Sequence, residues 1–328
     1  MAASVLLRFA AGLAALVAGV AAVAVAAVLL ERTPGPAPAA VSAAVPTAPA
    51  RAAPAAPRAP AGFPAPPAGA VVFSREDGGY ALALGVVPQG SHVVAQASLL
   101  GPLGAPVRGV SVSFTVQSAT RNGAACGSGC YRATLPVTGR PSAVVVDVQG
   151  RGATTRWRVS LPAAWPPVNA SVLVARAGRV WRSLRSLAFV ETLASDPAHA
   201  VSSSWRLAAP DRAAYHVTGG YESVIIGRRR WDKAPGGRWV ESPQSIPIRQ
   251  PQPFWVSATN AYLLGSGEIR GRRVWRVSFF DPATPAWFEV ELDKQTLRTL
   301  DLRMTTTAHF MHDVYGPFDA PAGITPPS

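Results

Sequence analysis

The chain has 328 residues, a length that predicts about two domains. Its formal net charge is +13, but the basic residues are mostly arginines scattered along predicted strands, and the tightest cluster, residues 227–233, is short. This distribution argues against nucleic-acid binding. It favours a basic surface that faces solvent, anionic lipid head groups or cell-wall polymers.

Residues 1–32 are predicted to form a transmembrane signal-anchor helix. No charged residue occurs between Phe9 and Leu30, and at 1.5 Å per residue such a helix is about 33 Å long, enough to cross a bilayer core. The apolar stretch is longer than the roughly 7–15 residues of a cleaved signal peptide, so a retained anchor is favoured. Arg8 places the N-terminus in the cytoplasm, which predicts a single-pass protein of the cell membrane with the bulk of the chain extracytoplasmic.

Residues 33–69 consist mostly of Ala and Pro and contain no acidic residue. A segment of this composition cannot bury a core or continue a regular helix, so we expect a disordered linker. Densely spaced prolines favour extended polyproline II at about 3.1 Å per residue, so the linker would hold the rest of the chain up to about 100 Å from the membrane.

Residues 70–167 predict an immunoglobulin-like β-sandwich. Short apolar runs recur there, most of them separated by Gly, Pro or Asn, and no helical periodicity interrupts them. The seven expected strands lie near residues 71–73, 80–87, 93–100, 110–116, 131–135, 143–148 and 156–161.

The only two cysteines, Cys126 and Cys130, enclose Gly-Ser-Gly. Glycines allow the tight loop that brings two Cα atoms within the ~4.4–6.8 Å of a disulfide, which is favoured over a metal site in an oxidising compartment. A Cu(I) site would use the same two thiolates in reduced form and stays open as the alternative.

The segment from Ala81 to Leu161, with its Cys-Gly-Ser-Gly-Cys-Tyr turn at residues 126–131, resembles the YtkA-like extracytoplasmic domain of actinobacterial copper-resistance proteins of the CopD type. In those proteins the domain follows the last membrane helix, to which the N-terminal helix here is similar. The resemblance covers only the tail of such a protein and leaves out the multi-span part to which copper transport is ascribed. It implies a copper-handling accessory whose partner is a membrane copper transporter.

Residues 168–322 predict a second domain of α+β class, and residues 323–328 a disordered tail, so that the whole chain is mainly β. The stretch 178–195 predicts an amphipathic helix, and the shorter apolar runs after it predict seven to nine antiparallel strands. The helix prediction rests on apolar residues at three- or four-residue steps, with charged residues turned away. The apolar residues are Val180, Leu184, Leu187 and Val190, and the charged ones are Arg182, Arg185 and Glu191.

The stretch from Pro285 to Tyr315 predicts the closing hairpin of this domain, with its turn at residues 293–296. Apolar residues alternate with polar ones along both strands, so one face is expected to be covered and the other to face water. The residues expected on the wet face are Trp287, Glu289, Glu291, Thr299, Asp301 and Arg303.

The order of a leading helix and a long series of strands resembles the LolA/LppX class of envelope proteins. In that class a curved antiparallel sheet forms a half-barrel, and helices close its open side around a lipid. The matching features are the leading helix with Leu184 and Leu187, the turn at residues 209–212, the strand pair at 224–231 and the turn at 293–297. Residues 280–288 and 308–311 are similar to segments of actinobacterial envelope proteins. The resemblance covers about half of the chain and implies a curved half-barrel with one or more helices over its concavity.

No catalytic motif occurs in the chain, and no nucleophile, base or phosphate-binding loop has the expected spacing. The apolar face of the closing hairpin, beside strands rich in Trp, favours a membrane-anchored, non-enzymatic protein that binds a lipid or another apolar ligand. A scaffold without a ligand is an alternative. The expected ligand pocket consists of Leu184, Leu187, Val290, Leu292, Leu300, Leu302, Met304 and Phe310.

His309 and Met311 are the candidate metal ligands, because imidazole and thioether groups suit copper. On an unbroken strand these two residues share a face, about 7 Å apart, whereas Met304 and His312 share the opposite face about 26 Å apart. The four residues therefore cannot form one site on such a strand, and a His309–Met311 pair would need ligands from elsewhere. No cofactor other than copper is expected.

Overall fold

The computed structural model describes residues 63–77, 79–101, 104–150, 154–194, 200–244 and 246–328. The chain divides into two compact units, Met1–Ala61 and Gly62–Ser328, and the described residues belong to the second. The predicted transmembrane helix and residues 33–62 of the predicted linker lie outside the described residues. Among the described residues, no helix has the length and apolar character needed to cross a membrane.

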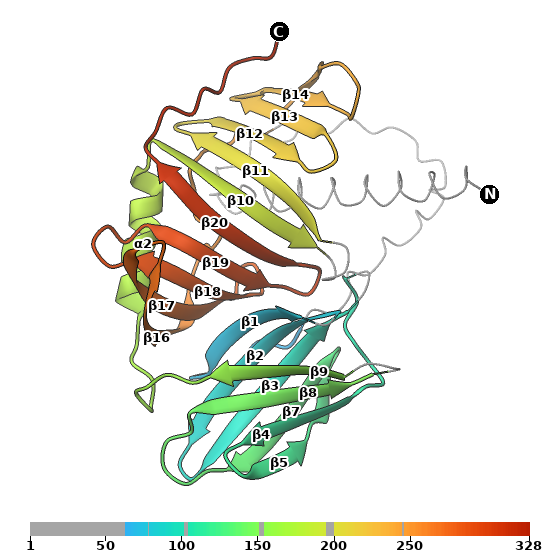
Figure 1. Cartoon of the computed structure of the whole chain (residues 1–328), viewed down its shortest axis with the longest axis vertical. Coiled ribbons are helices and arrows are strands. Elements are labelled where there is room, and N and C mark those ends of the chain that lie inside the picture. The colour runs from blue at the N-terminus through green and yellow to red at the C-terminus, as the bar shows by residue number, and fades with distance from the viewer. Residues whose placement is uncertain (1–62, 78, 102–103, 151–153, 195–199, 245) are drawn as a thin grey trace, which may run out of the picture. The chain divides into compact units, whose positions relative to one another are not determined.

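Two antiparallel sheets form a β-sandwich in the first part of the described chain (Figure 1). Their inner faces share one core, with Phe73 and Leu84 from the larger sheet and Phe114 and Trp157 from the smaller. All seven predicted strands are present, while the immunoglobulin-like assignment stays a prediction. The larger sheet has the order β1 (Val71–Asp77), β2 (Tyr80–Gln89), β3 (His92–Leu100), β7 (Cys130–Pro136), β6 (Ala124–Gly127), and the smaller sheet the order β5 (Ala119–Asn122), β4 (Ser111–Val116), β8 (Ala143–Gln149), β9 (Thr154–Ser160).

The predicted disulfide is confirmed. Cys126 in β6 is bonded to Cys130 in β7, with the two Cα atoms 5.0 Å apart. Both sulfur atoms are used in this bond, so the alternative of a Cu(I)-thiolate site at this pair is contradicted.

The second part of the chain forms one antiparallel sheet of eleven strands, which is open and not closed into a barrel (Figure 1). Its last strand in sequence, β20, pairs with its first, β10, near the middle of the sheet and so joins two series of hairpins. The strand order is β15 (Val240–Pro243), β14 (Arg229–Lys233), β13 (Tyr221–Ile226), β12 (Arg212–Val217), β11 (Val201–Ala208), β10 (Ser186–Ala194), β20 (Phe310–Phe318), β19 (Thr299–Thr305), β18 (Ala286–Asp293), β17 (Arg272–Asp281), β16 (Thr259–Ile269).

The helix predicted at residues 178–195 is partly wrong. Helix α2 (Ser171–Ser183) starts earlier and ends at Ser183. Leu184 after it has extended backbone, and strand β10 follows. The spacing of Leu184, Leu187 and Val190 suited a helix, but Leu187 is buried whereas Val190 is 50% exposed. Over so few residues, the apolar spacing fits a continuous helix and also fits a helix that is followed by an alternating strand. The sequence pattern alone does not distinguish the two.

The eleven-stranded sheet is covered differently on its two faces. We call the face that packs against α2 the helix face, and the face that packs against β1 the sandwich face. On the helix face, the ring of Trp181 from α2 lies 5.1 Å from the ring of Tyr315. On the sandwich face, the hydroxyl groups of Ser74 and Thr305 form a 2.6 Å hydrogen bond. Two buried faces explain why β2 and β3 are buried along almost their whole length, since the larger sheet of the sandwich packs on both sides.

The polar side of the closing hairpin was expected to face water, and this expectation is wrong. Glu289 accepts a 2.8 Å hydrogen bond from the backbone N–H of Ser74 and forms an ion pair with Arg75. Arg303 forms an ion pair with Glu76 in the same strand β1. Burial raises the pKa of the Glu289 carboxyl, and the charge of Arg75 opposes this rise. The alternation was predicted correctly, but it carried no sign that the sandwich covers the charged side.

Both ends of the described chain are packed. The ring of Phe63 is buried 6.0 Å from the ring of Trp287, and the amide of Asn260 donates to the carbonyl oxygen of Pro67, so ordered structure begins before the predicted boundary at residue 70. At the other end Ile324 is buried, and its carbonyl oxygen accepts a 2.8 Å hydrogen bond from Arg212. Ile324, which lies in the tail predicted to be disordered from residue 323, is therefore packed.

Candidate functional site

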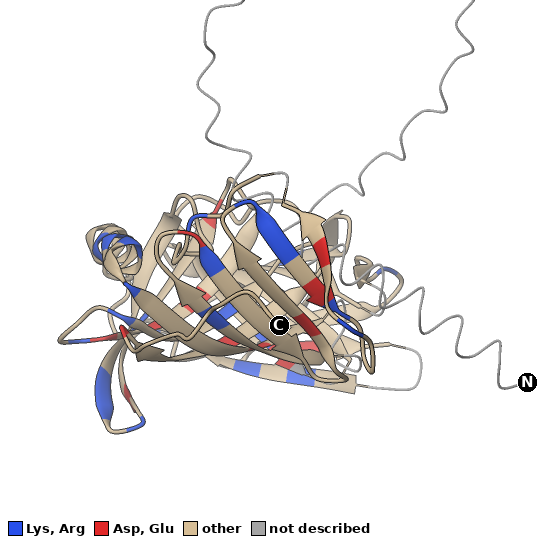
Figure 2. Ribbon diagram, turned by 90° about the horizontal axis from the view of Figure 1, so that it is seen from above, with Lys and Arg blue, Asp and Glu red and all other residues tan. Residues whose placement is uncertain are grey.

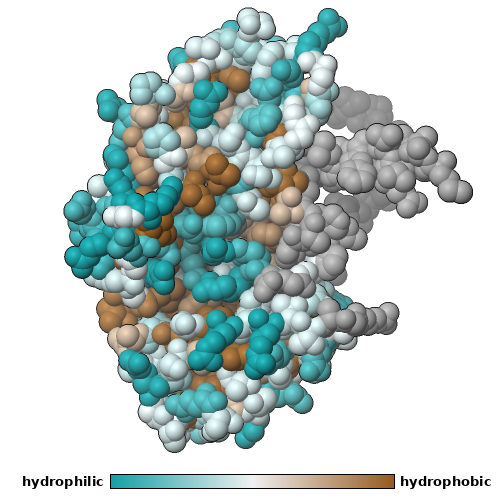
Figure 3. All heavy atoms as spheres, viewed as in Figure 1, coloured by the Kyte–Doolittle hydropathy of each residue, from teal (hydrophilic) through white to brown (hydrophobic). Residues whose placement is uncertain are grey.

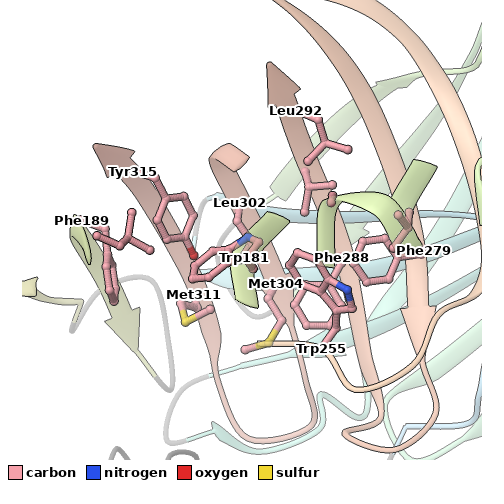
Figure 4. Close-up of a cluster of buried hydrophobic side chains, with 14 of the residues drawn as sticks. Trp181, Phe189, Trp255, Phe279, Phe288, Leu292, Leu302, Met304, Met311 and Tyr315 are labelled. Atoms are coloured by element: carbon pink, nitrogen blue, oxygen red, sulfur yellow. The ribbon is translucent and has the colours of Figure 1, made fainter. Parts of the chain in front are cut away.

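The helix face is apolar over strands β17, β18 and β19. Val277, Val290 and Leu302 are cross-strand partners and form one row across these strands, all of them buried. The cover consists of α2 and the segment between β15 and β16, which contributes Phe254 and the buried Trp255 (Figure 4). The result is a continuous apolar layer between one sheet and one helix.

Trp181 of α2 lies at the centre of this layer. Its ring makes edge-to-face contacts with Phe254, Trp255 and Tyr315 at centroid distances of 6.3, 6.2 and 5.1 Å. Its indole N–H donates a 2.8 Å hydrogen bond to the hydroxyl of Thr299, so the one polar atom of the ring is satisfied. These contacts fix α2 on the sheet.

The predicted pocket residues fall into three groups. Six of the eight belong to the buried cluster on the helix face, whereas Leu300 is buried outside it. Phe310 belongs to the cluster between the sheet and the sandwich, on the other side. The six are Leu184, Leu187, Val290, Leu292, Leu302 and Met304. Whether they contact a ligand stays a prediction.

A buried polar group interrupts the apolar row at β20. The partner of Leu302 is Asp313, and the partner of Asp313 in β10 is Glu191, followed by Ser203 in β11. Both carboxyls are buried, and the Tyr315 hydroxyl donates a 2.5 Å hydrogen bond to Oδ2 of Asp313. Oδ1 of Asp313 has no hydrogen-bond partner among the described residues. We call Asp313, Glu191, Tyr315 and Ser203 the polar seam.

The electrostatics of the polar seam favour protonation. Burial raises the pKa of Asp313 well above its usual value, and the nearby carboxylate of Glu191 raises it further. Burial also raises the pKa of Glu191, although hydrogen bonds from the Ser203 hydroxyl at 2.8 Å and the Trp205 indole at 2.9 Å oppose this rise. Two adjacent buried carboxyls cannot both ionise cheaply, so the pair retains a proton at pH values where an isolated carboxyl has lost it.

Beyond the polar seam, aromatic rings from neighbouring strands stack on the helix face. Trp205 lies 5.7 Å from Phe189 and 4.3 Å from Tyr215, and Tyr215 lies 6.1 Å from Tyr221. The Tyr221 hydroxyl ends the series by donating a 2.8 Å hydrogen bond to Asp232.

The metal candidates His309 and Met311 lie at the turn between β19 and β20 and in β20. A turn at residues 306–309 separates β19 from β20, so the unbroken strand assumed for this segment is wrong, and Met304 lies opposite Met311 on the helix face. His312 lies on the sandwich face, where its Nε2 is 2.9 Å from Asp301. No group of three or more His, Cys, Asp or Glu able to hold a metal ion occurs among the described residues. That set of residue types does not include Met, so copper binding at His309 and Met311 stays a prediction.

On the side of the molecule seen in Figure 3, hydrophobic residues appear as small areas separated by hydrophilic ones. This agrees with the burial of the large apolar side chains, since the exposed large hydrophobic residues of the described chain are valines.

No family model matches the chain, and no curated protein matches it significantly. Among solved structures the chain is similar to the lipoprotein LppX of Mycobacterium tuberculosis, with 14% identity, a TM-score of 0.38 and coverage of 47% of this chain and 98% of LppX. It is also similar to LprF of Mycobacterium bovis, with 12% identity, a TM-score of 0.37 and coverage of 48% and 97%. A DUF1329 family protein of Desulfovibrio piger has 10% identity, a TM-score of 0.26 and coverage of 48% and 93%. All three TM-scores are below 0.5, so these likenesses carry no argument about this chain, and its predicted LolA/LppX type of fold stays a prediction.

The polar seam is not evident from the sequence alone. The helical spacing of residues 178–195 puts Glu191 on the outer side of a helix, and no motif marks Asp313. The available signal was the strand alternation of residues 187–193, in which Glu191 occupies a position that otherwise holds apolar residues. A charged residue at an inward strand position is the pattern that marks a buried polar site.

Proposed function

We propose that this protein is a membrane-anchored, extracytoplasmic binding protein that holds a lipid or another amphiphile on the helix face and catalyses no reaction. The observation that carries the proposal is that one row of cross-strand partners changes from apolar to acidic residues. Val277, Val290 and Leu302 are apolar, and the same row continues as Asp313 and Glu191. One face thus offers an apolar surface beside buried polar groups, as an amphiphile requires.

The polar seam supplies the chemistry for a head group. Oδ1 of Asp313 is buried without a partner among the described residues, and a buried acceptor without a hydrogen bond costs about 1–3 kcal/mol. A hydroxyl or amide N–H of a ligand placed at this atom would remove that cost. The apolar part of the same ligand would then lie along β17 to β19, away from water.

Entry of the apolar part requires movement of the cover. Trp181 and Trp255 occupy the layer between α2 and the sheet, so an acyl chain can reach Val290 only where α2 or the segment before β16 gives way. The hydrogen bond from Trp181 to Thr299 and the ring contacts are the interactions that opening would break. Ligand binding is therefore expected to increase the exposure of Trp181 to a quencher.

Photolabelling tests the proposal on the full chain. The protein is reconstituted with a phospholipid that carries a diazirine in one acyl chain, irradiated and digested with trypsin. Label is expected in the peptide from Val277 to Lys294, which contains the second half of β17 and all of β18, and an excess of unlabelled lipid should compete it away. Label confined to residues 1–32 would contradict lipid binding on the helix face.

Two valines of the sheet give a matched pair of variants. Val290→Thr places a hydroxyl in the apolar layer and should lower labelling of this peptide, whereas Val190→Thr changes a residue that is 50% exposed and should leave labelling unchanged. Circular dichroism of both variants checks that the sheet is intact.

A scaffold without a ligand is the second candidate. The close ring contacts of Trp181 favour it, because they fill the layer between α2 and the sheet with side chains of the protein itself. Equal labelling of wild type, Val290→Thr and a heat-denatured sample would support the scaffold over the amphiphile-binding protein.

A further inference from the structure

The outer side of α2 carries arginines that have no acidic partner. Arg176, Arg179 and Arg182 are exposed, and basic bands mark the helix in Figure 2. No acidic residue occurs in the sequence between Asp147 and Glu191, which includes the whole helix. Among the described residues, none forms a hydrogen bond or ion pair with these three side chains.

Helix geometry places these arginines on one surface. Val172, Arg176 and Arg179 follow each other at four- and three-residue steps and so share a face. We call this side of α2, together with Arg182 one further three-residue step along, the arginine face. The opposite face of the helix is buried on the sheet through Val174 and Trp181. The arginine face is therefore the outward side of the only helix in the described part of the chain.

Several basic residues on the described strands, unlike those of α2, have acidic partners. Arg229 pairs with Glu241 at 2.7 Å, and Lys233 pairs with Glu222 at 3.0 Å. On α2, by contrast, like charges three residues apart repel each other, at a cost of about 0.2–0.5 kcal/mol per pair. A helix that keeps this repulsion on its solvent side has a surface suited to an anionic partner outside the chain.

We propose that the arginine face of α2 docks on an anionic lipid surface. Guanidinium groups bind phosphate oxygens in a bidentate manner, and a row of them matches a plane of phosphate groups. Val168 and Val172, which lie just before and within the first turn of α2, are 51% and 74% exposed and supply apolar contact at the interfacial region. This docking does not depend on amphiphile binding on the helix face, because it uses the opposite side of α2.

Arginine footprinting of the full chain tests this surface. The chain is incubated with vesicles of phosphatidylcholine alone or with vesicles that also contain phosphatidylglycerol, and the modification rate of each arginine by a dicarbonyl reagent is measured by mass spectrometry. Rates at Arg176, Arg179 and Arg182 should fall at least about tenfold on the anionic vesicles, since each arginine near such a surface contributes about 1 kcal/mol. They should recover in about 1 M salt, where the Debye length is ~3 Å.

Exposed arginines outside α2 are the internal control. Arg121, Arg158 and Arg238 are exposed as well and should keep their rates. Equal rates at the α2 arginines on both kinds of vesicle would overturn the proposal, and so would an equal slowing of the control arginines. The labelling test of the proposed function reads out residues 277–294, so the two ideas can fail independently.

A charge-matched pair of variants separates this surface from net charge. In the first, Arg176, Arg179 and Arg182 are changed to Gln, and Arg185 serves as the reporter because it is exposed directly after α2. Arg185 is expected to be protected on anionic vesicles in the wild type and to lose this protection in this variant. The second variant carries Gln at the three control positions, and Arg185 should keep its protection there. Equal loss in both variants would mean that only total charge matters and would refute the proposal.

Discussion

Protonation of His309 is expected to destabilise the protein at acidic pH. The side chain lies in the turn between β19 and β20, and its Nε2 atom is buried without a hydrogen-bond partner among the described residues. Burial lowers the pKa of His309 from 6.5 to about 4. The unfolded chain therefore binds a proton at a pH where the folded chain does not, which favours unfolding as the pH falls through this range.

The size of the effect follows from the two pKa values. The contribution of His309 is fully present above pH 6.5 and is lost progressively down to about pH 4, where the loss reaches about 3 kcal/mol at 1.36 kcal/mol per unit. Urea denaturation of the full chain at several pH values between these limits measures it, with His309→Gln as the variant. Gln has no proton to gain, so the variant should lose less stability than the wild type on acidification, by about 3 kcal/mol at pH 4.

The comparison with the variant isolates His309 from other groups. Asp313 has a raised pKa and acts in the opposite direction, but its contribution is common to wild type and variant and cancels in their difference. A difference between wild type and His309→Gln that does not change between pH 7.5 and pH 4 would refute the buried, neutral imidazole.

Three further predictions concern the core and the loop. Asp313→Asn should raise stability at neutral pH. Because the pKa of Asp313 is raised in the folded state, the stability of the wild type falls as the pH rises from about 3.9 to the folded-state pKa. Urea denaturation above and below this pH window should show that the variant lacks this fall. Trp181→Ala should cost about 3–5 kcal/mol of unfolding free energy, against less than about 0.5 kcal/mol for Val172→Ala on the exposed side of the same helix. Cys126→Ser should cost at most about 2 kcal/mol in urea denaturation, because the disulfide closes a loop of sequence separation 4, and a loss above that value would contradict the loop-entropy argument.

Strand periodicity predicted most of the fold, because it reports which residues face a core. The runs of the sandwich and the hairpin with its turn after Asp293 appear where the alternation placed them, and the Asp293 side chain accepts hydrogen bonds from the backbone N–H groups of Gln295 and Thr296. Periodicity failed at residues 184–191, where the same spacing fits a helix and a strand.

The features of the fold that the sequence did not predict depend on contacts between residues far apart in the chain. The covering of Glu289 by β1 joins residues more than 200 positions apart, and no local pattern encodes it. The turn at residues 306–309 contains neither Gly nor Pro, so it gave no turn signal, and without it Met304 could not be placed opposite Met311. Cross-strand neighbours become visible only when both turns and register are known.

The division of the helix face follows the path of the chain. Strands β16 to β19 form one hairpin series and supply the apolar side, whereas β10 to β15 form the other series and supply Glu191, Ser203 and the stacked rings. Strand β20 joins them, and on its helix face the apolar Met311 is followed by the polar Asp313 and Tyr315. Met311 completes the apolar row of Met304, and Asp313 begins the polar seam. An amphiphile that lies across this junction would contact both series at once, so its binding would link the two halves of the sheet. The Val290 variant should weaken contacts with the apolar part of this ligand, and the Asp313 variant should weaken contacts with its polar part.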